Sequence, residues 1–393
     1  MERIGIFGGT FNPPHTGHIR AAVQGAEVLG LDRVLMIPAR QVPGKQIPPG
    51  SPTPEQRLEM VRLASEACPK LEVSNLEVSR PGNSYTWQTL TALREQYPGA
   101  DFTLMVGSDM LLSLPKWQRA EEILKSASVA VLPRGGKQEK ALLPGGVAAL
   151  EAMGAEVTVM ETVPCEISST QLRRLLAFRC ASPFLDPAVE DYIVKNGLYC
   201  TASDWKKLPM AQLEQVVISL LNPNRVRHVL GCRDTAVELA RRWGADEEDA
   251  ARAGILHDVT KALDGSLQLT LCRAYGTLLD DFSIKYPKTL HALTGSLVAE
   301  RIFGENKAVV SAIRHHTTGK ADMNTLETII YVADYMEPNR DFPGVEELRR
   351  LAFMDLRAAL KLGLEMTLEH LKDQGNQVSP ESRQALDWLK GRD

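Results

Sequence analysis

The stretch Ile4-Gly-Ile-Phe-Gly-Gly-Thr-Phe-Asn-Pro-Pro-His-Thr-Gly-His18 decides the fold of the first half of the chain. It opens with an apolar run, Ile4–Phe7, which predicts a short buried strand. Gly8 and Gly9 follow this run, and because they carry no Cβ they let the backbone approach a phosphate closely. The sequence then predicts a helix that starts near Thr16, a good N-cap residue. The free N–H groups of that helix start would form an anion site beside the strand end.

Two histidines, His15 and His18, fall at this predicted helix start, where both rings can reach the same phosphate. No Lys-Ser or Lys-Thr pair follows the glycines, so the segment is not a Walker loop. Two histidines three residues apart can also be a purely structural pair, and the spacing alone leaves both interpretations open. The complete arrangement of strand, Gly-Gly-Thr-Phe-Asn-Pro, His-x-Gly-His and helix is more specific. It resembles the nucleotidyltransferase superfamily that transfers nucleoside monophosphate groups.

Short apolar runs alternate with helical patterns over residues 1–202, the predicted first domain. This alternation predicts a doubly wound, Rossmann-like α/β fold with a mainly parallel sheet, whose ligands bind beyond the carboxyl ends of the strands. The expected strands are Ile4–Phe7, Val34–Pro38, Leu71–Ser74, Phe102–Val106, Val129–Leu132 and Val157–Met160, and the expected helices include Ile19–Leu29, Pro54–Ala67, Thr86–Gln96 and Ala120–Lys125.

Further segments of the first domain resemble bacterial nicotinate-nucleotide adenylyltransferases. They are Ser84-Tyr-Thr86 at a helix start, Gly107-Ser-Asp109 at a strand end and Ile167-Ser-Ser-Thr-Gln-Leu-Arg173 at another helix start, together with Lys45, Arg57, Met60, Arg134 and Tyr192–Tyr199. Two loop positions depart mildly from that family: Gly44 replaces the histidine of a usual Pro-His-Lys, and Ser108 replaces a frequent alanine.

This resemblance implies adenylyl transfer from ATP to nicotinate mononucleotide, giving nicotinate adenine dinucleotide and pyrophosphate, a step of NAD biosynthesis. The attacking phosphate has a second pKa near about 6 and is already anionic at neutral pH, so no strong base is needed. The enzyme must instead align ATP and neutralise charge on its phosphates, with Mg²⁺ bridging phosphate oxygens.

The residues that the resemblance implies for this reaction form two groups. ATP would be bound by Gly8, Gly9, Thr10, His15, His18, Gly107, Asp109, Ser168, Ser169, Thr170 and Arg173, with His15 and His18 as catalytic residues. Nicotinate mononucleotide would be bound by Lys45, Thr86 and Trp117. The Trp117 indole would stack on the nicotinate ring, although a core aromatic is the alternative interpretation of this residue.

The second half of the chain, residues 203–393, shows almost no strand pattern and predicts an all-α domain. The boundary is expected near Ala202–Pro209, a short polar stretch that ends in proline. The expected helices are Leu213–Leu221, Val226–Trp243, Glu247–Val259, Leu290–Phe303, Lys307–His316, Leu326–Tyr335 and Val345–Asp373.

Histidines and carboxylates follow one another in this half in the order His, His-Asp, His, His, Asp. A single buried histidine is more often an ordinary core residue, but this complete order resembles the HD phosphohydrolase superfamily. Imidazole and carboxylate ligands suit Fe, Mn, Co or Zn, and without a thiolate a structural zinc site is not expected. The resemblance implies the metal ligands His228, His257, Asp258, His291, His316 and Asp334, with the His257-Asp258 pair on one helix and Asp258 catalytic. His315 is assigned to the wall of the site, and an exchange with His316 stays open.

Three strings, Ala253–Lys261, Ala312–Gly319 and Tyr331–Arg340, resemble the HD hydrolases that split diadenosine tetraphosphate (Ap4A) symmetrically into two ADP. That resemblance implies an iron centre, expected to be dinuclear, with Mn or Co as alternatives. Two metals would generate a nucleophile from water and polarise the attacked phosphoryl oxygen. Two metals cannot offset four phosphates, so Arg227, Lys261 and Arg340 are candidates for polyphosphate binding, with solvated surface charge as the alternative.

Composition and hydropathy limit the kinds of partner that we expect for this chain. A net charge of −4 excludes a global basic field for nucleic acid, and no apolar run reaches the roughly 18 residues of a membrane span. With six cysteines, no CxxC pair and no signal sequence, we expect a cytoplasmic enzyme that acts on small molecules.

Each domain has one rival function. The first domain could instead transfer a nucleotidyl group to phosphopantetheine or a polyol phosphate, although Trp117 and Ser84–Thr86 argue against this. The second could bind a nucleotide without cleaving it, although its complete ligand set argues against this.

Overall fold

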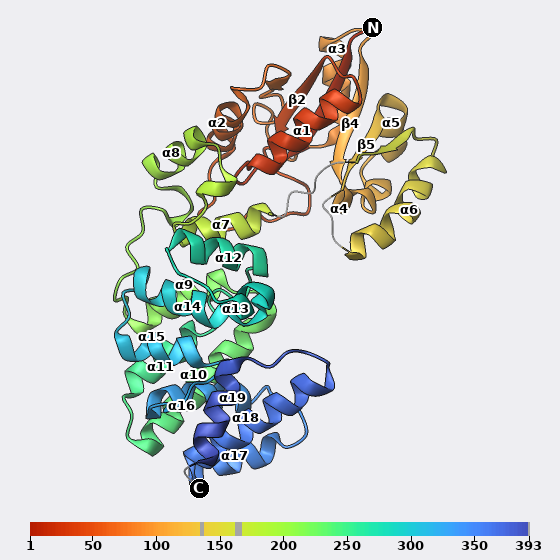
Figure 1. Ribbon diagram of the computed structural model, residues 1–393. Helices are drawn as coiled ribbons and strands as arrows, with labels where there is room; N and C mark the ends of the chain where they lie inside the picture. Colours follow the sequence, from red (N-terminus) through yellow and green to blue (C-terminus); the bar gives the residue numbers. More distant parts are fainter. Residues whose placement is uncertain (134–136, 162–166, 392–393) are drawn as a thin grey trace. The chain divides into compact units, whose positions relative to one another are not determined.

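The computed structural model describes residues 1–133, 137–161 and 167–391, so Arg134 and Cys165 lie outside the described residues. The chain divides into two compact units, Met1–Ser203 and Asp204–Asp393 (Figure 1). Among the described residues, no helix combines the length and apolarity needed to cross a membrane.

The first unit is built on a six-stranded parallel sheet with the order β3-β2-β1-β4-β5-β6. The strands are β1 (Arg3–Gly9), β2 (Arg33–Pro38), β3 (Leu71–Val73), β4 (Asp101–Gly107), β5 (Ser128–Leu132) and β6 (Val157–Val159). The helices are α1 (Thr16–Val28), α2 (Pro54–Ser65), α3 (Thr86–Gln96), α4 (Ser108–Leu111), α5 (Ala120–Ser126), α6 (Lys137–Glu151), α7 (Ser169–Ala177) and α8 (Pro187–Lys195). The predicted α/β class and all six predicted strands are confirmed.

Alternate residues of the strands face two separate hydrophobic cores, which explains why helices cover both faces of the sheet. In β2, Val34 and Met36 pack in one core with Ala22 and Ala26 of α1. The intervening Leu35 packs in the other core, with α3 and α5. Strand order reverses at β1, which pairs with β2 on one side and β4 on the other. Ligands of such sheets bind at this reversal, where β1 ends in the Gly-Gly pair.

The second unit is helical, as predicted. Its helices are α9 (Met210–Leu220), α10 (Val226–Trp243), α11 (Glu247–Leu256), α12 (Gly265–Ala274), α13 (Asp281–Lys285), α14 (Leu290–Arg301), α15 (Lys307–His315), α16 (Thr325–Met336), α17 (Val345–Met354), α18 (Leu356–Asp373) and α19 (Pro380–Lys390) (Figure 1). The sequence pattern did not predict α12, α13 or α19.

The segment after the unit boundary packs on this helical unit and is not a free linker. The Trp205 ring stacks on Phe303, with ring centroids 5.7 Å apart, and the Lys207 N–H donates to the Phe303 carbonyl at 2.8 Å. Arg252, whose guanidinium also pairs with Glu305, donates to the Leu208 carbonyl at 2.9 Å. These contacts attach the chain from Trp205 onward to the second unit.

Three local expectations are wrong. The residue before α1 that occupies the N-cap is His15, not Thr16, which is the first helical residue. The single helix expected over 345–373 is two helices, because Asp355 has an extended backbone and its carboxylate caps α18 by accepting the Ala358 N–H at 2.9 Å. His257 and Asp258 are not both within a helix, since α11 ends at Leu256 and His257 is its C-cap.

Candidate active sites

His15 and His18 lie together at the N-terminus of α1. The Nδ1 atom of His18 accepts the backbone N–H of His15 at 3.1 Å, and the two ring centroids are 3.6 Å apart. Phe11 packs edge-on against His18, at a centroid distance of 5.1 Å. His18 is thereby oriented by its Nδ1 atom. Gly8, near the end of β1, is exposed and leaves space for a ligand, because an added Cβ would meet nothing closer than the Ile37 carbonyl at 3.9 Å.

The loop between β1 and α1 is held from outside by side chains distant in sequence. Arg57 of α2 is fully buried and donates to the Thr10 carbonyl at 2.6 Å and the Arg40 carbonyl at 2.9 Å. On the other side of the loop, Tyr199 donates to Asn12 Oδ1 at 2.8 Å. These bonds hold the loop at Thr10 and Asn12, so its conformation is fixed before a ligand binds.

The predicted phosphate-binding residues of α7 lie against the same loop. Ser169 Oγ donates to the Pro13 carbonyl at 3.1 Å, and Arg173 donates to the Asn12 carbonyl at 2.8 Å and to Thr170 Oγ1 at 3.1 Å. Ser168 is the N-cap of α7, since its hydroxyl accepts the Gln171 N–H at 3.3 Å. The structure therefore places Ser169 and Arg173 in contact with the β1–α1 loop, and all four side chains already make contacts within the protein.

The other predicted residues of this site lie at the edges of the same region. Lys45 Nζ is 3.4 Å from Thr10 Oγ1, and Gly107 ends β4, the neighbour of β1, with Asp109 in the short α4 that follows. Thr86 is the first residue of α3. Trp117 is partly buried against a core cluster, and its Nε1 donates to Ser113 Oγ at 3.2 Å. This environment agrees partly with each interpretation of Trp117, because the indole packs on the core and still has an accessible part.

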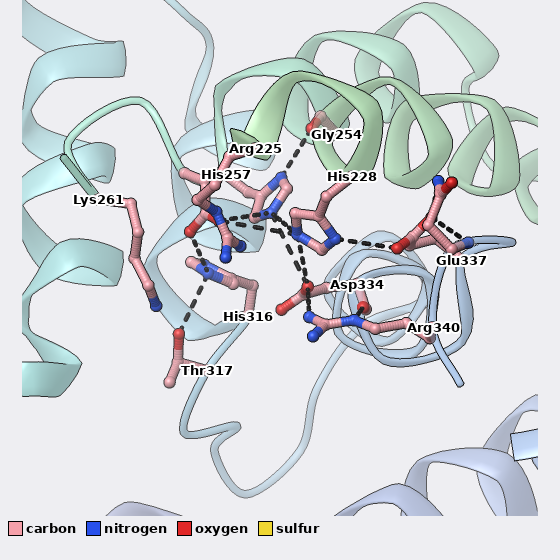
Figure 2. A network of polar contacts seen from close by, with 12 residues as sticks. Arg225, His228, Gly254, His257, Lys261, His316, Thr317, Asp334, Glu337 and Arg340 are labelled. Carbon is pink, nitrogen blue, oxygen red and sulfur yellow. Dashed lines mark hydrogen bonds and ion pairs between the residues drawn. The ribbon is translucent and has the colours of Figure 1, made fainter. Parts of the chain in front are cut away.

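The predicted ligands of the second unit come from five different segments. His228 lies in the first turn of α10, His257 and Asp258 follow α11, His291 lies in α14, His316 follows α15, and Asp334 lies in α16. Figure 2 shows the rings of His228, His257 and His316 converging with Asp334. His257, Asp258 and His316 lie just after helix C-termini, and His228 and His291 lie in the first turns of their helices, so the site is formed mainly at helix ends.

Two overlapping groups of these residues could each hold a metal ion. His228, His257 and Asp334 offer ligand atoms that all lie within 4.8 Å of one another, and so do His257, Asp258 and His316. His228 Nε2 is 3.1 Å from Asp334 Oδ1, and Asp258 Oδ1 is 3.6 Å from His291 Nε2 and 3.9 Å from His316 Nε2. His315, the last residue of α15, belongs to neither group.

Each of the four histidines has its Nδ1 atom held by an acceptor, which leaves Nε2 to face the centre of the site. The acceptors are the Glu337 carboxylate at 3.1 Å for His228, and the carbonyls of Gly254 at 2.7 Å for His257, Lys288 at 3.0 Å for His291 and Ile313 at 2.7 Å for His316. Metal-bound histidines are characteristically oriented in this way. Glu337 was not predicted as a functional residue, although it stands in the Tyr331–Arg340 string.

The buried carboxylate of Asp258 provides a direct test of whether the residues fit a cation. Its Oδ1 atom is buried and has no hydrogen-bond partner among the described residues, and such an atom is costly to leave unpaired. Burial alone would raise the pKa of Asp258, but His257, His291 and Lys261 outweigh it and hold that pKa well below its usual range. Burial lowers the pKa of His316 to about 4, so its imidazole is neutral and available as a ligand. These donors fit a metal ion.

Three cationic side chains border the candidate metal-ligand atoms. Arg225, from the short helix η4 (Pro223–Arg225), contacts Asp258 Oδ2, and Arg340 Nη2 is 2.6 Å from Asp334 Oδ1. Lys261 Nζ is 2.9 Å from His291 Nε2. Arg227 is exposed, and its side chain makes no hydrogen bond or ion pair to the described residues. The arginine of this segment that reaches the site is therefore Arg225, which the sequence did not single out.

The class of protein follows from these two folds and sites. Residues 6–175 match the cytidylyltransferase-like family model and residues 225–339 match the HD domain model. The chain is thus a nucleotidyltransferase unit followed by an HD-domain unit.

The relatives define the family more closely. A probable nicotinate-nucleotide adenylyltransferase from Gloeobacter violaceus is 40% identical over 205 residues, which cover 50% of this chain and 96% of the relative. The chain belongs to this family through its first unit. A Mycoplasma pneumoniae protein named probable nicotinate-nucleotide adenylyltransferase/Ap4A hydrolase is 27% identical over 376 residues, covering 93% of this chain and 98% of that protein.

Solved structures are also similar to parts of this chain, and one of them covers about half of it. It is a predicted HD superfamily hydrolase involved in NAD metabolism from Clostridium acetobutylicum, 36% identical, covering 47% of this chain and 99% of that one, with a TM-score of 0.46.

Proposed function

We propose that the chain is a bifunctional enzyme: it adenylylates nicotinate mononucleotide with ATP and hydrolyses Ap4A symmetrically to two ADP. The observation that carries the second activity is the convergence of four histidine Nε2 atoms with the carboxylates of Asp258 and Asp334, where the buried Asp258 Oδ1 atom has no hydrogen-bond partner among the described residues. The first activity is supported by the paired His15 and His18 rings at the reversal point of the sheet, and by the family to which the first unit belongs.

In the first site, the chain contributes alignment and charge neutralisation. His15, His18 and the N-terminus of α1 would face the ATP phosphates. Arg173 and Thr170 would approach the same phosphates from α7. The remaining residues would line the pocket (Ser168, Ser169, Thr10, Gly8 and Gly9) or lie at its edge (Gly107 and Asp109). Lys45, Thr86 and Trp117 would bind nicotinate mononucleotide. Because the acceptor phosphate is itself the nucleophile, no residue is needed to remove its proton. Magnesium would accompany ATP as part of the substrate.

In the second site, His228, His257, Asp258 and Asp334 would hold one metal ion, and Asp258, His291 and His316 a second. Metal ions bound there would polarise the phosphoryl oxygen and activate water. The backbone carbonyls and Glu337 behind the imidazoles keep the four Nε2 atoms directed at the metals. Iron is the metal we propose, and Mn and Co suit the same ligands.

One purified preparation of the full chain tests both activities. It should form nicotinate adenine dinucleotide from ATP and nicotinate mononucleotide, with much lower rates for nicotinamide mononucleotide and phosphopantetheine. With Fe²⁺ or Mn²⁺ it should convert Ap4A mainly to ADP. Release of AMP plus ATP would contradict symmetrical cleavage, and tight binding of Ap4A without turnover would favour a regulatory HD module.

A further inference from the structure

Arg225 occupies a ligand atom of the proposed metal centre. Its guanidinium contacts Asp258 Oδ2, on the carboxylate that both proposed metals would share. Asp258 Oδ2 also lies 3.5 Å from His257 Nε2 and 3.7 Å from His228 Nε2, so it faces the first metal group. A metal ion and the Arg225 guanidinium therefore compete for the same oxygen.

The position of Arg225 differs from that of the residues it contacts. Asp258 is 1% exposed, whereas the Arg225 side chain is 31% exposed and enters the site from its rim. Its Nε atom is buried and has no hydrogen-bond partner among the described residues, so the ion pair leaves a donor of this guanidinium unused. A partly exposed arginine with an unused donor can pair with another anion when its first partner is taken.

Arg340 and Lys261 repeat this arrangement at two other ligand atoms. Arg340 contacts Asp334, which would bind the first metal, and Lys261 contacts His291 Nε2, which would bind the second. If metals take these ligand atoms, three cationic groups are freed at the rim of one site. A chain of four phosphates needs positive charge beyond two divalent ions, and a guanidinium binds phosphate oxygens in pairs.

We propose that Arg225 has two successive partners: it pairs with Asp258 while the site lacks metal, and it binds the phosphate chain of the nucleotide once metal occupies Asp258. This inference rests on the proposed hydrolase function of the second unit. It assigns to Arg225 the polyphosphate role that the sequence suggested for Arg227.

The test separates metal binding from phosphate binding in the full chain. Isothermal titration of metal-free Arg225→Gln protein with Mn²⁺ should give an affinity equal to or higher than that of the unsubstituted protein, because the competing cation is gone. Titration of the Mn²⁺-loaded variant with ADP should give an affinity lower by about 10-fold or more, as expected for loss of a charge-assisted hydrogen bond. Arg225→Lys should recover part of that affinity.

Arg241→Gln is the matched control, because it removes another arginine of the same unit whose carboxylate pair, 2.7 Å to Glu247, is exposed. It should change neither titration. If Arg225→Gln weakens Mn²⁺ binding as well, Arg225 only orients Asp258 and the proposal fails. It fails equally if ADP affinity is unchanged, if Arg227→Gln lowers it instead, or if the unsubstituted Mn²⁺-loaded protein binds no ADP. Failure of Ap4A hydrolysis alone would overturn the proposed function and leave both titrations interpretable.

Discussion

Tyr199 donates a 2.8 Å hydrogen bond to the side-chain oxygen of Asn12, a residue 187 positions earlier in the chain. Asn12 also donates to Ser51 Oγ at 3.1 Å, and its carbonyl accepts from Arg173 at 2.8 Å. Burial raises the pKa of Tyr199, so its phenol remains a neutral donor at physiological pH. The last turn of the first unit thus fixes the loop that carries His15.

Tyr199→Phe should destabilise the first unit by about 1–3 kcal/mol, because it leaves the buried Asn12 oxygen without its donor. Urea denaturation of the full chain measures this change, and the rate of nicotinate adenine dinucleotide formation should fall with it. Tyr192→Phe is the control, since Tyr192 is a partly exposed residue of α8 whose phenol has no hydrogen bond to the described residues. Equal stability of the two variants would show that the Tyr199–Asn12 bond does not support the loop.

His18→Ala should lower kcat/KM for nicotinate adenine dinucleotide formation by about 100-fold or more, the usual size of one preorganised electrostatic contact. The variant also frees the His15 N–H, which His18 Nδ1 accepts. His18→Asn, which can offer a side-chain oxygen to that N–H, separates the two effects. Near-normal turnover in His18→Ala would exclude a role for His18 at the ATP phosphates.

Glu337→Gln should weaken metal binding by roughly 10- to 100-fold, because the buried Glu337 carboxylate orients His228 through its Nδ1 atom at 3.1 Å. Metal titration of the metal-free full chain measures the affinity directly. The control is Glu346→Gln, an exposed carboxylate in the first turn of α17 that contacts Arg349. Indistinguishable affinities in the two variants would remove Glu337 from the metal site.

Asp258→Ala should abolish Ap4A hydrolysis and lower the metal content, while adenylyl transfer remains at its normal rate. The reason is that both proposed metal ions would share Asp258, which also lies 3.6 Å from His291 Nε2, whereas the first site is built from residues of the other unit. Both reactions and the metal content are measured on the same preparation. A parallel loss of adenylyl transfer would mean that the two sites are not independent.

The sequence predicted those features that depend on local pattern. Continuous apolar runs such as Val34–Pro38 identify strands buried on both faces. The full set of proposed ligands in the second unit came from the resemblance of their order along the chain to that of HD phosphohydrolases, and it stays a prediction. The spacing could not show that α11 stops before His257, because Asp258 and Val259 continue the same helical pattern. It also could not reveal the break at Asp355, where a side-chain cap interrupts an otherwise periodic helix.

Residues that act through tertiary contacts were the hardest to predict. Arg225 and Arg227 are equivalent in sequence terms, as two arginines just before a histidine ligand. Only the turn of the chain at η4 directs Arg225 to Asp258 and leaves Arg227 exposed. Glu337 likewise becomes recognisable only when α16 places its end beside His228.

The segment from Trp205 to Leu208 packs on the second unit. This packing limits where two genes could be joined to encode such a chain. A junction between Ser203 and Asp204 joins two complete cores, because the Trp205–Phe303 stack and the Arg252–Leu208 bond both remain on the C-terminal side. Recombination only six residues later, at Met210, would remove the indole that covers Phe303.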